Sequence, residues 1–140
     1  MKEKILVTGS AGFIGSHLSK SLLDDGFEVC GIDNINDYYD PRLKLDRLEN
    51  LKTYENFSFK KVDISDQSNL SKCFNDFNPK KVVNLAAQAG VRYSIENPFA
   101  YSQSNLIGFL NIIELCRHNN IEGLIILTLI NNIMSGRKFN

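Results

Sequence analysis

Charge of one sign does not predominate in this chain of 140 residues. Sixteen lysines and arginines balance sixteen aspartates and glutamates, and no basic cluster stands out locally. Such a chain has no net electrostatic field with which to hold a polyanion. We therefore expect neither a nucleic acid nor an anionic membrane surface as a partner.

Cysteines and long apolar runs are also scarce. Cys30, Cys73 and Cys116 are odd in number and far apart, with no Cys-x-x-Cys pair and no histidine at ligand spacing. We expect no disulfide framework and no metal site, but small buried residues in a reducing compartment. The longest apolar run, residues 124–130, is well short of the roughly 20 residues that span a bilayer. The N-terminal run ends at Thr8, too soon for a signal peptide, so the chain is expected to be cytoplasmic.

A turn with three glycines is the most informative stretch. An apolar run at residues 4–8 leads into Gly9, Gly12 and Gly15, after which apolar residues recur at helical spacing. This order of strand, tight turn and helix is typical of dinucleotide binding. Gly9 lets the chain leave the strand sharply, Gly12 removes a side chain where a pyrophosphate approaches, and Gly15 lets the helix pack closely. The free N–H groups of the new helix then face the phosphates.

An acidic residue follows the second apolar run. Residues 29–32 form this run, and Asp33 ends it. An acid about 20 residues beyond the glycine turn accepts hydrogen bonds from the adenosine ribose hydroxyls and repels a 2′-phosphate. Because Asn34 comes next and no arginine is adjacent, the sequence predicts NAD rather than NADP as cofactor.

Strands and helices alternate through the rest of the chain. Strands are predicted at residues 57–62, 81–85 and 123–129, with a helix from Pro41, a helix at 68–77 and a long helix at 98–118. The helix from Pro41 has Leu43, Leu45, Leu48 and Leu51 as its expected apolar side. The expected apolar face of the long helix comprises Phe99, Leu106, Phe109, Leu110, Ile113 and Cys116.

This alternation predicts an α/β fold, a Rossmann-type doubly wound parallel sheet with strand order 3-2-1-4-5. A ligand would bind at the carboxyl ends of the strands, where the order reverses. Four strand ends meet at that edge: residues 9–14, Asp33, the pair Asp63 and Ile64, and residues 85–89.

Several of these stretches together resemble one family. Residues 8–15, Asp33 with Asn34, Asp63 with Ile64, residues 85–87 and Asn105 resemble the extended short-chain dehydrogenase/reductase family of NAD-dependent sugar-nucleotide epimerases and dehydratases. Residues 36–41 and 86–94 are similar to its UDP-glucuronate 4-epimerase branch. The resemblance runs from residue 1 to about residue 125.

The resemblance implies NAD as cofactor, a UDP-glucuronate-like nucleotide sugar as substrate, and a set of site residues. Phe13 and Ile14 would cover the pyrophosphate, Asp33 and Asn34 the adenosine ribose, and Asp63 and Ile64 the adenine. The inner ribose and nicotinamide would meet Leu85, Ala86, Ala87, Gln88 and Ala89, and Asn105 would also belong to the cofactor site. Arg92 would meet a substrate phosphate or carboxylate, or be only a surface charge.

The sequence departs from this family in its catalytic residues. The family moves a hydride between sugar C4 and NAD, through a 4-keto sugar, while a tyrosine assisted by a lysine carries the hydroxyl proton. None of the five tyrosines here is followed four residues later by lysine. Residues 127–134 replace the hydroxyl-rich segment that the family has after strand five, and within them only Thr128 offers a hydroxyl. We expect residues 1–130 to be an incomplete NAD-binding domain truncated after strand five, with a divergent tail at 131–140, no substrate domain and no activity alone.

Other interpretations use the same residues. A non-catalytic NAD-binding or dimerising module needs no acid–base pair, and an NAD-dependent sugar-nucleotide dehydratase would belong to the same family. A methyltransferase also has a glycine turn and an acid after strand two, but Thr8 before Gly9 and residues 85–87 argue against it. The apolar fifth strand would lie at an edge, which predicts self-association or a homodimer through that strand.

Overall fold

The computed structural model describes residues 2–127 and has one parallel sheet of five strands. The strand order is β3-β2-β1-β4-β5, as predicted, and every neighbouring pair is parallel. The strands are β1 (Lys4–Thr8), β2 (Glu28–Asp33), β3 (Phe57–Lys61), β4 (Lys81–Asn84) and β5 (Gly123–Ile126). The helices are α1 (Phe13–Asp24), α2 (Pro41–Leu51), α3 (Gln67–Phe77), α4 (Val91–Glu96), α5 (Pro98–Ser102), the π-helix η1 (Gln103–Gly108) and α6 (Phe109–His118).

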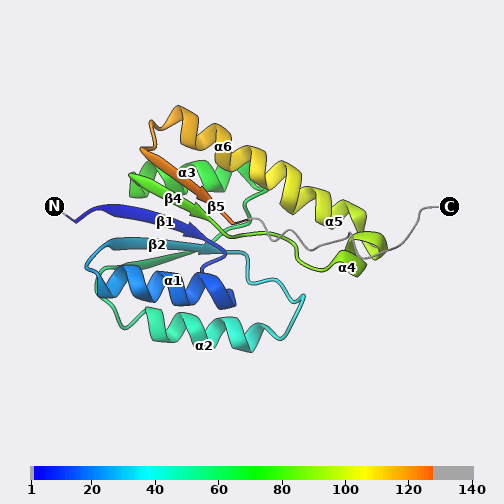
Figure 1. Ribbon diagram of the computed structural model, residues 1–140, viewed down its shortest axis with the longest axis horizontal. Coiled ribbons are helices and arrows are strands. Elements are labelled where there is room, and N and C mark those ends of the chain that lie inside the picture. The colour runs from blue at the N-terminus through cyan, green and yellow to red at the C-terminus, as the bar shows by residue number, and fades with distance from the viewer. Residues whose placement is uncertain (1, 128–140) are drawn as a thin grey trace, which may run out of the picture.

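Helices cover both faces of the sheet. Figure 1 shows α1 and α2 below the strands and α3 and α6 above them. Successive residues of β1 alternate between the two cores, because side chains of a strand point to opposite faces. Leu6 packs with α3 and α6, whereas Ile5 and Val7 pack with α1 and α2. Burial on both faces confirms the expected doubly wound architecture.

Side-chain caps begin three of the helices. Asp40 accepts a hydrogen bond from Arg42 N ahead of Pro41, and Asn97 accepts one from Ala100 N ahead of Pro98. Both Asx-Pro starts were predicted from the sequence, and both fit the preference for a polar cap followed by proline. Asp66 caps α3 in the same way, through Asn69 N.

The predicted apolar side of α2 is partly wrong. Leu48 and Leu51 are buried, but Leu43 and Leu45 are about half exposed. Two residues apart on a helix are about 200° apart around its axis, so these two leucines cannot share a face. Lys44 is buried instead, on the side of Leu48 and Leu51.

The predicted face of the long helix is also mostly wrong. Leu106, Leu110 and Ile113 lie on the exposed side, and Phe99 is 86% exposed. Of the predicted set, Cys116 is buried, and the buried face is completed by Gly108, Asn111, Ile112 and Leu115. The π-helical turn η1 lies within this helix, and its wider turn shifts the register on which a 3.6-residue pattern depends.

Element ends differ by small amounts from the sequence predictions. β3 ends at Lys61, and α4 was not predicted. β5 ends at Ile126, and the predicted strand positions 128 and 129, including Thr128, lie outside the described residues. None of the helices within residues 2–127 has the length and hydropathy needed to cross a lipid bilayer.

Candidate functional site

The glycine turn has the geometry predicted for Gly9 and Gly15. Gly9 has φ +68°, and a Cβ there would lie 2.9 Å from Ala86 N, so the turn bends sharply and touches the end of β4. A Cβ on Gly15 would overlap the carbonyl oxygen of Gly9, so α1 can pack on the turn only without a side chain. Gly12 precedes the helix as its N-cap residue and makes no side-chain cap hydrogen bond, which leaves the first N–H groups of α1 without a side-chain acceptor there.

Asp33 is buried directly beneath this turn. Its Oδ2 accepts a hydrogen bond from Ala11 N at 3.2 Å, and its Oδ1 accepts one from Ile35 N at 2.8 Å. Lys44 of α2 contributes a third donor, because its Nζ lies 3.3 Å from the same Oδ1 and both side chains are buried. The sequence has no basic residue adjacent to Asp33, but the fold brings one to it.

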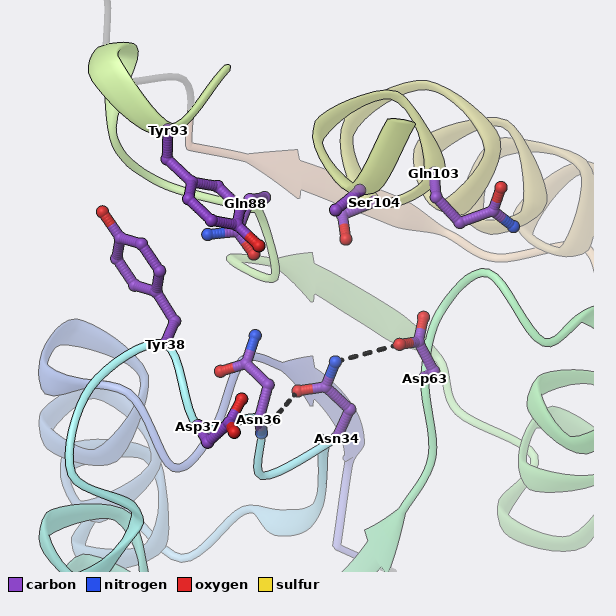
Figure 2. A pocket seen from close by; sticks show the side chains of 10 residues that line it. Asn34, Asn36, Asp37, Tyr38, Asp63, Gln88, Tyr93, Gln103 and Ser104 are labelled. Carbon is purple, nitrogen blue, oxygen red and sulfur yellow. Dashed lines mark hydrogen bonds between the residues drawn. The ribbon is translucent and has the colours of Figure 1, made fainter. Parts of the chain in front are cut away.

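A second carboxylate marks the end of β3. Asp63 Oδ2 accepts a hydrogen bond from Asn34 Nδ2 at 2.9 Å, and Asp63 Oδ1 accepts two from Ser65. Partial burial acts to raise the pKa of Asp63, but the hydrogen bonds from Asn34 and Ser65 outweigh it and hold the pKa below its usual value. Asp63 is therefore an anionic acceptor beside Asn34, the two strand ends being joined side chain to side chain (Figure 2).

Ile64 has a different environment from Asp63. Its side chain belongs to the core cluster above the sheet and packs where Gly108 of η1 has no side chain. Its carbonyl oxygen accepts a hydrogen bond from Asn111 Nδ2 at 3.0 Å, and so does the carbonyl of Ser65 at 3.2 Å. Any contact of Ile64 with a ligand therefore has to come from its backbone.

The ends of β1 and β4 are joined by Thr8. Its hydroxyl donates to Asn84 Oδ1 at 2.6 Å and accepts the N–H groups of Leu85 and Ala86 at 3.1 Å each. This arrangement uses the donor and the acceptor capacity of one buried hydroxyl. It fixes the start of the 85–89 segment against the glycine turn.

The other end of that segment is fixed by Asn105. Asn105 Oδ1 accepts the N–H of Gln88 at 2.9 Å, and its Nδ2 donates to the carbonyl of Gln88 at 3.0 Å. Asn105 lies in η1, and π-helical turns are frequent at functional sites. Ala87 and Ala89 are exposed on either side of the buried Gln88.

A cleft of about 250 Å³ opens above these strand ends. Figure 2 shows Asn34, Asn36 and Asp63 on one side of it, and Gln88, Gln103 and Ser104 across from them. Tyr38 and Tyr93 close one end, with ring centroids 5.2 Å apart in an edge-to-face contact. The Tyr38 hydroxyl group lies where a Cβ on Gly90 would be, so the loop after β2 touches the segment after β4.

Arg92 does not line the cleft. Its side chain is 93% exposed and pairs with Glu96 one turn along α4, with 3.3 Å between Nε and Oε1. Phe13 and Ile14, which the family resemblance assigns to the pyrophosphate, lie exposed at the start of α1. Thr128 lies outside the described residues. Residues 2–127 hold no group of three or more histidine, cysteine or acidic side chains suited to a metal ion.

Sequence reasoning missed several residues of this site. Lys44 shares a helical face with Leu48 and Leu51, a spacing that signals burial but not the partner. No sequence motif marks Asn84, at the last position of β4, or Asn111, on the buried face of α6. The contact of Tyr38 with Tyr93 joins residues 55 positions apart, and no local pattern predicts it.

Known proteins resemble this chain along most of its length. The family model described as GDP-mannose 4,6 dehydratase matches residues 6–129. Protein CapI of Staphylococcus aureus is 59% identical over 122 residues, which are 87% of this chain and 36% of that protein. UDP-glucuronate 4-epimerase of Thermodesulfobacterium geofontis is 46% identical over 121 residues, which are 86% of this chain and 38% of that protein.

The fold has solved counterparts as well. The UDP-glucuronic acid 4-epimerase of Bacillus cereus, solved in complex with NAD, has a TM-score of 0.80 and 31% sequence identity, over 96% of this chain and 42% of that chain. This chain therefore spans a little over a third of the length of the curated relatives named above. The match over residues 6–129 includes the glycine turn, all five strand ends and the cleft, and it leaves no support for the methyltransferase alternative. The chain belongs to the nucleotide-sugar epimerase and dehydratase family that the GDP-mannose 4,6 dehydratase model represents.

Proposed function

We propose that this chain binds NAD and is the cofactor-binding part of a nucleotide-sugar 4-epimerase that acts on a UDP-glucuronate-like substrate. The observation that carries the proposal is the buried Asp33 carboxylate, held against Ala11 of the glycine turn at 3.2 Å. A carboxylate at this position accepts ribose hydroxyls and disfavours a 2′-phosphate. Relatives that are UDP-glucuronate 4-epimerases, one of them solved with NAD, support the choice of cofactor and sugar.

The residues present fit an extended dinucleotide. Gly12 has no side chain at the start of α1, where a pyrophosphate would approach, and Phe13 and Ile14 are exposed beside it. Asn34 and Asp63 offer a donor and an acceptor in the cleft to an adenosine, and Ala86, Ala87 and Ala89 present small side chains to the nicotinamide end. When bound, NAD supplies a hydride acceptor for the sugar C4 carbon.

The chain's own residues position the cofactor but include no identified proton acceptor. Tyr38, Tyr39, Tyr54, Tyr93 and Tyr101 are followed four positions later by Arg42, Leu43, Ser58, Asn97 and Asn105, so a lysine partner is absent at that spacing. General acid–base catalysis contributes roughly 10²–10⁴-fold, and substrate positioning contributes more. We therefore propose that this chain alone does not interconvert nucleotide sugars.

Two alternatives keep specific support. The missing Tyr-x-x-x-Lys pair favours a non-catalytic NAD-binding module built from the same site. The description of the matching family model favours an NAD-dependent sugar-nucleotide dehydratase. Both share the cofactor site with the epimerase proposal and differ from it in the reaction that the site serves.

We also propose that the chain associates with a second copy through β5. Among residues 2–127, β5 pairs with β4 on one side and with no strand on the other. Ile125 is 62% exposed, and Ile126 and Leu127 are about 40% exposed. An apolar, uncharged strand edge is a template for pairing with another chain.

Turnover with NAD present tests the proposed inactivity and the dehydratase alternative. The chain is incubated with NAD and UDP-glucuronate, UDP-galacturonate or, as a dehydratable sugar, GDP-mannose, and the products are followed by nuclear magnetic resonance in a sample free of host epimerase. The proposal expects NAD binding without interconversion. Clear interconversion of the two sugars would refute inactivity and would require a base not identified in this sequence, and a 4-keto-6-deoxy product from a dehydratable sugar would favour the dehydratase alternative.

A further inference from the structure

Lys44 is an unusual residue to find beneath a dinucleotide turn. Its side chain is 7% exposed, and lysine is almost never fully buried unless it is paired. Its Nζ contacts Asp33 Oδ1 at 3.3 Å and Asn36 Oδ1 at 2.9 Å, and it lies 5.2 Å from the centre of the Tyr39 ring. The carboxylate, the amide oxygen and the aromatic ring each attract a cation. The fold therefore places the Lys44 ammonium group at the ribose end of the site.

Within residues 2–127, the hydrogen bonds of the Asp33 carboxylate all come from donors. Lys44 Nζ and Ile35 N reach Oδ1, and Ala11 N reaches Oδ2. If the carboxylate is removed, one ammonium and two backbone N–H groups are left around the vacated space. Three convergent donors, one of them charged, match the oxygens of a phosphate group.

Arg47 adds a second cation one turn further along α2. Its Nη1 donates to the carbonyl of Ala11 at 3.2 Å and to the Tyr39 hydroxyl at 3.2 Å, and its guanidinium carbon lies 6.0 Å from the centre of the Phe13 ring. Ala11 therefore donates to Asp33 through its N–H and accepts from Arg47 through its carbonyl. Arg47 therefore contacts the turn directly at Ala11, and Lys44 is linked to the same residue through Asp33.

We infer that Lys44 and Arg47 form a latent binding site for the 2′-phosphate of an adenosine dinucleotide, which the Asp33 carboxylate occupies in this chain. Loss of the Asp33 carboxylate is then sufficient to reverse the selection of NAD over NADP, because the cations that would receive a 2′-phosphate are already in place. This inference rests on the proposed NAD-binding function, since it places the adenosine ribose at Asp33. It makes Lys44 a specificity-determining residue although it lies 11 positions beyond Asp33 in the sequence.

The test uses adenosine 2′,5′-bisphosphate and adenosine 5′-monophosphate, which differ only in the 2′-phosphate. In calorimetric titrations the unchanged chain is expected to prefer the monophosphate. Asp33→Ser removes the carboxylate and its volume, and we expect the preference to reverse by about tenfold or more, in line with a charge-assisted hydrogen bond. Adding Lys44→Met should abolish the reversal, and adding Arg47→Met should weaken it.

The matched control is Arg42→Met in the Asp33→Ser background. Arg42 lies on the same helix but is 85% exposed and pairs with Asp40, so its loss should leave the reversal intact. Asp33→Ala, which also empties the space of the carboxylate, replaces Asp33→Ser if circular dichroism shows that the serine variant is unfolded. The reversed preference should also weaken as salt is raised.

The inference and the proposed function fail in different ways. If neutral variants at position 33 still prefer the monophosphate, or if the reversal survives Lys44→Met, the latent site is refuted even when the unchanged chain binds NAD. If the unchanged chain binds no NAD but Asp33→Ser binds the bisphosphate in a Lys44-dependent way, the proposed function fails and the latent site stands. Binding of neither ligand to any folded variant refutes both.

Discussion

The side-chain amide of Asn105 forms two hydrogen bonds with the main chain of Gln88, one in each direction. This pair joins the π-helical turn η1 to the segment that follows β4. Because Thr8 fixes the same segment at Leu85 and Ala86, the 85–89 segment is held at both ends. The small side chains between these two points therefore keep a fixed position at the sheet edge.

Asn105→Ala should loosen this segment. A typical intramolecular hydrogen bond contributes about 1 kcal/mol, so two lost bonds should lower the free energy of unfolding by about 1–3 kcal/mol. Chemical denaturation measures this, and calorimetry should show weaker NAD binding. Asn50→Ala is the control, because Asn50 is exposed and its amide bonds only to the carbonyl of Asp46 in the same helix. Equal effects of the two substitutions would argue against a special role for Asn105.

Lys44→Met should destabilise the fold strongly. Removal of one partner from a buried ion pair leaves an uncompensated charge and costs about 3–5 kcal/mol. Lys52 offers a matched pair on the surface, with Glu49 at 2.8 Å, and Lys52→Met should cost less than about 1 kcal/mol. Urea unfolding of both variants makes the comparison. A Lys44 variant as stable as the Lys52 variant would mean that burial of the Asp33 carboxylate does not require the Lys44 ammonium group.

Asp63 should make the fold sensitive to acid. Hydrogen bonds from Asn34 and Ser65 overcome the opposing effect of burial and lower the pKa of Asp63 in the folded state from its usual 3.8. A lowered folded-state pKa gives stability that is present above the unfolded-state pKa and is lost as the pH falls through the folded-state pKa. The melting temperature should therefore drop between about pH 5 and pH 2, and less so in Asp63→Asn. Asp40→Asn, at an exposed carboxylate, should follow the unchanged chain.

Ile125→Lys should reduce self-association. The side chain of Ile125 lies exposed on β5, and a charge on an edge strand opposes pairing with another chain. Light scattering over a concentration series measures the apparent mass. Ile95→Lys places the same charge on α4, where the isoleucine is 79% exposed, and it should leave association unchanged. A monomer at every concentration, or an equal effect of both variants, would count against the β5 interface.

The sheet and the backbone of the site could be predicted from the sequence, because both depend on local patterns. Apolar runs ended at Asp33 and Asp63, and parallel strands necessarily bring such ends to one edge. The partners of those residues could not be predicted in this way. Lys44 reaches Asp33 only because α2 turns this one of its three basic residues inward, and Asn105 reaches Gln88 only through the π-helical turn. Both contacts depend on the rotation of a helix about its axis, which a mixed apolar pattern does not fix.

The central claim is that this chain binds NAD. Calorimetric titration of the purified chain with NAD and, separately, with NADP tests it most directly. Gly12→Val is the negative control, because a branched side chain would occupy the pyrophosphate position, and Gly123→Ala is the neutral one, because its Cβ would make only an ordinary contact with Lys81. We expect NAD to bind to the unchanged chain and to Gly123→Ala, NADP to bind more weakly or not at all, and Gly12→Val to bind neither. NADP binding as tight as NAD binding, or NAD binding that survives Gly12→Val, would contradict the account.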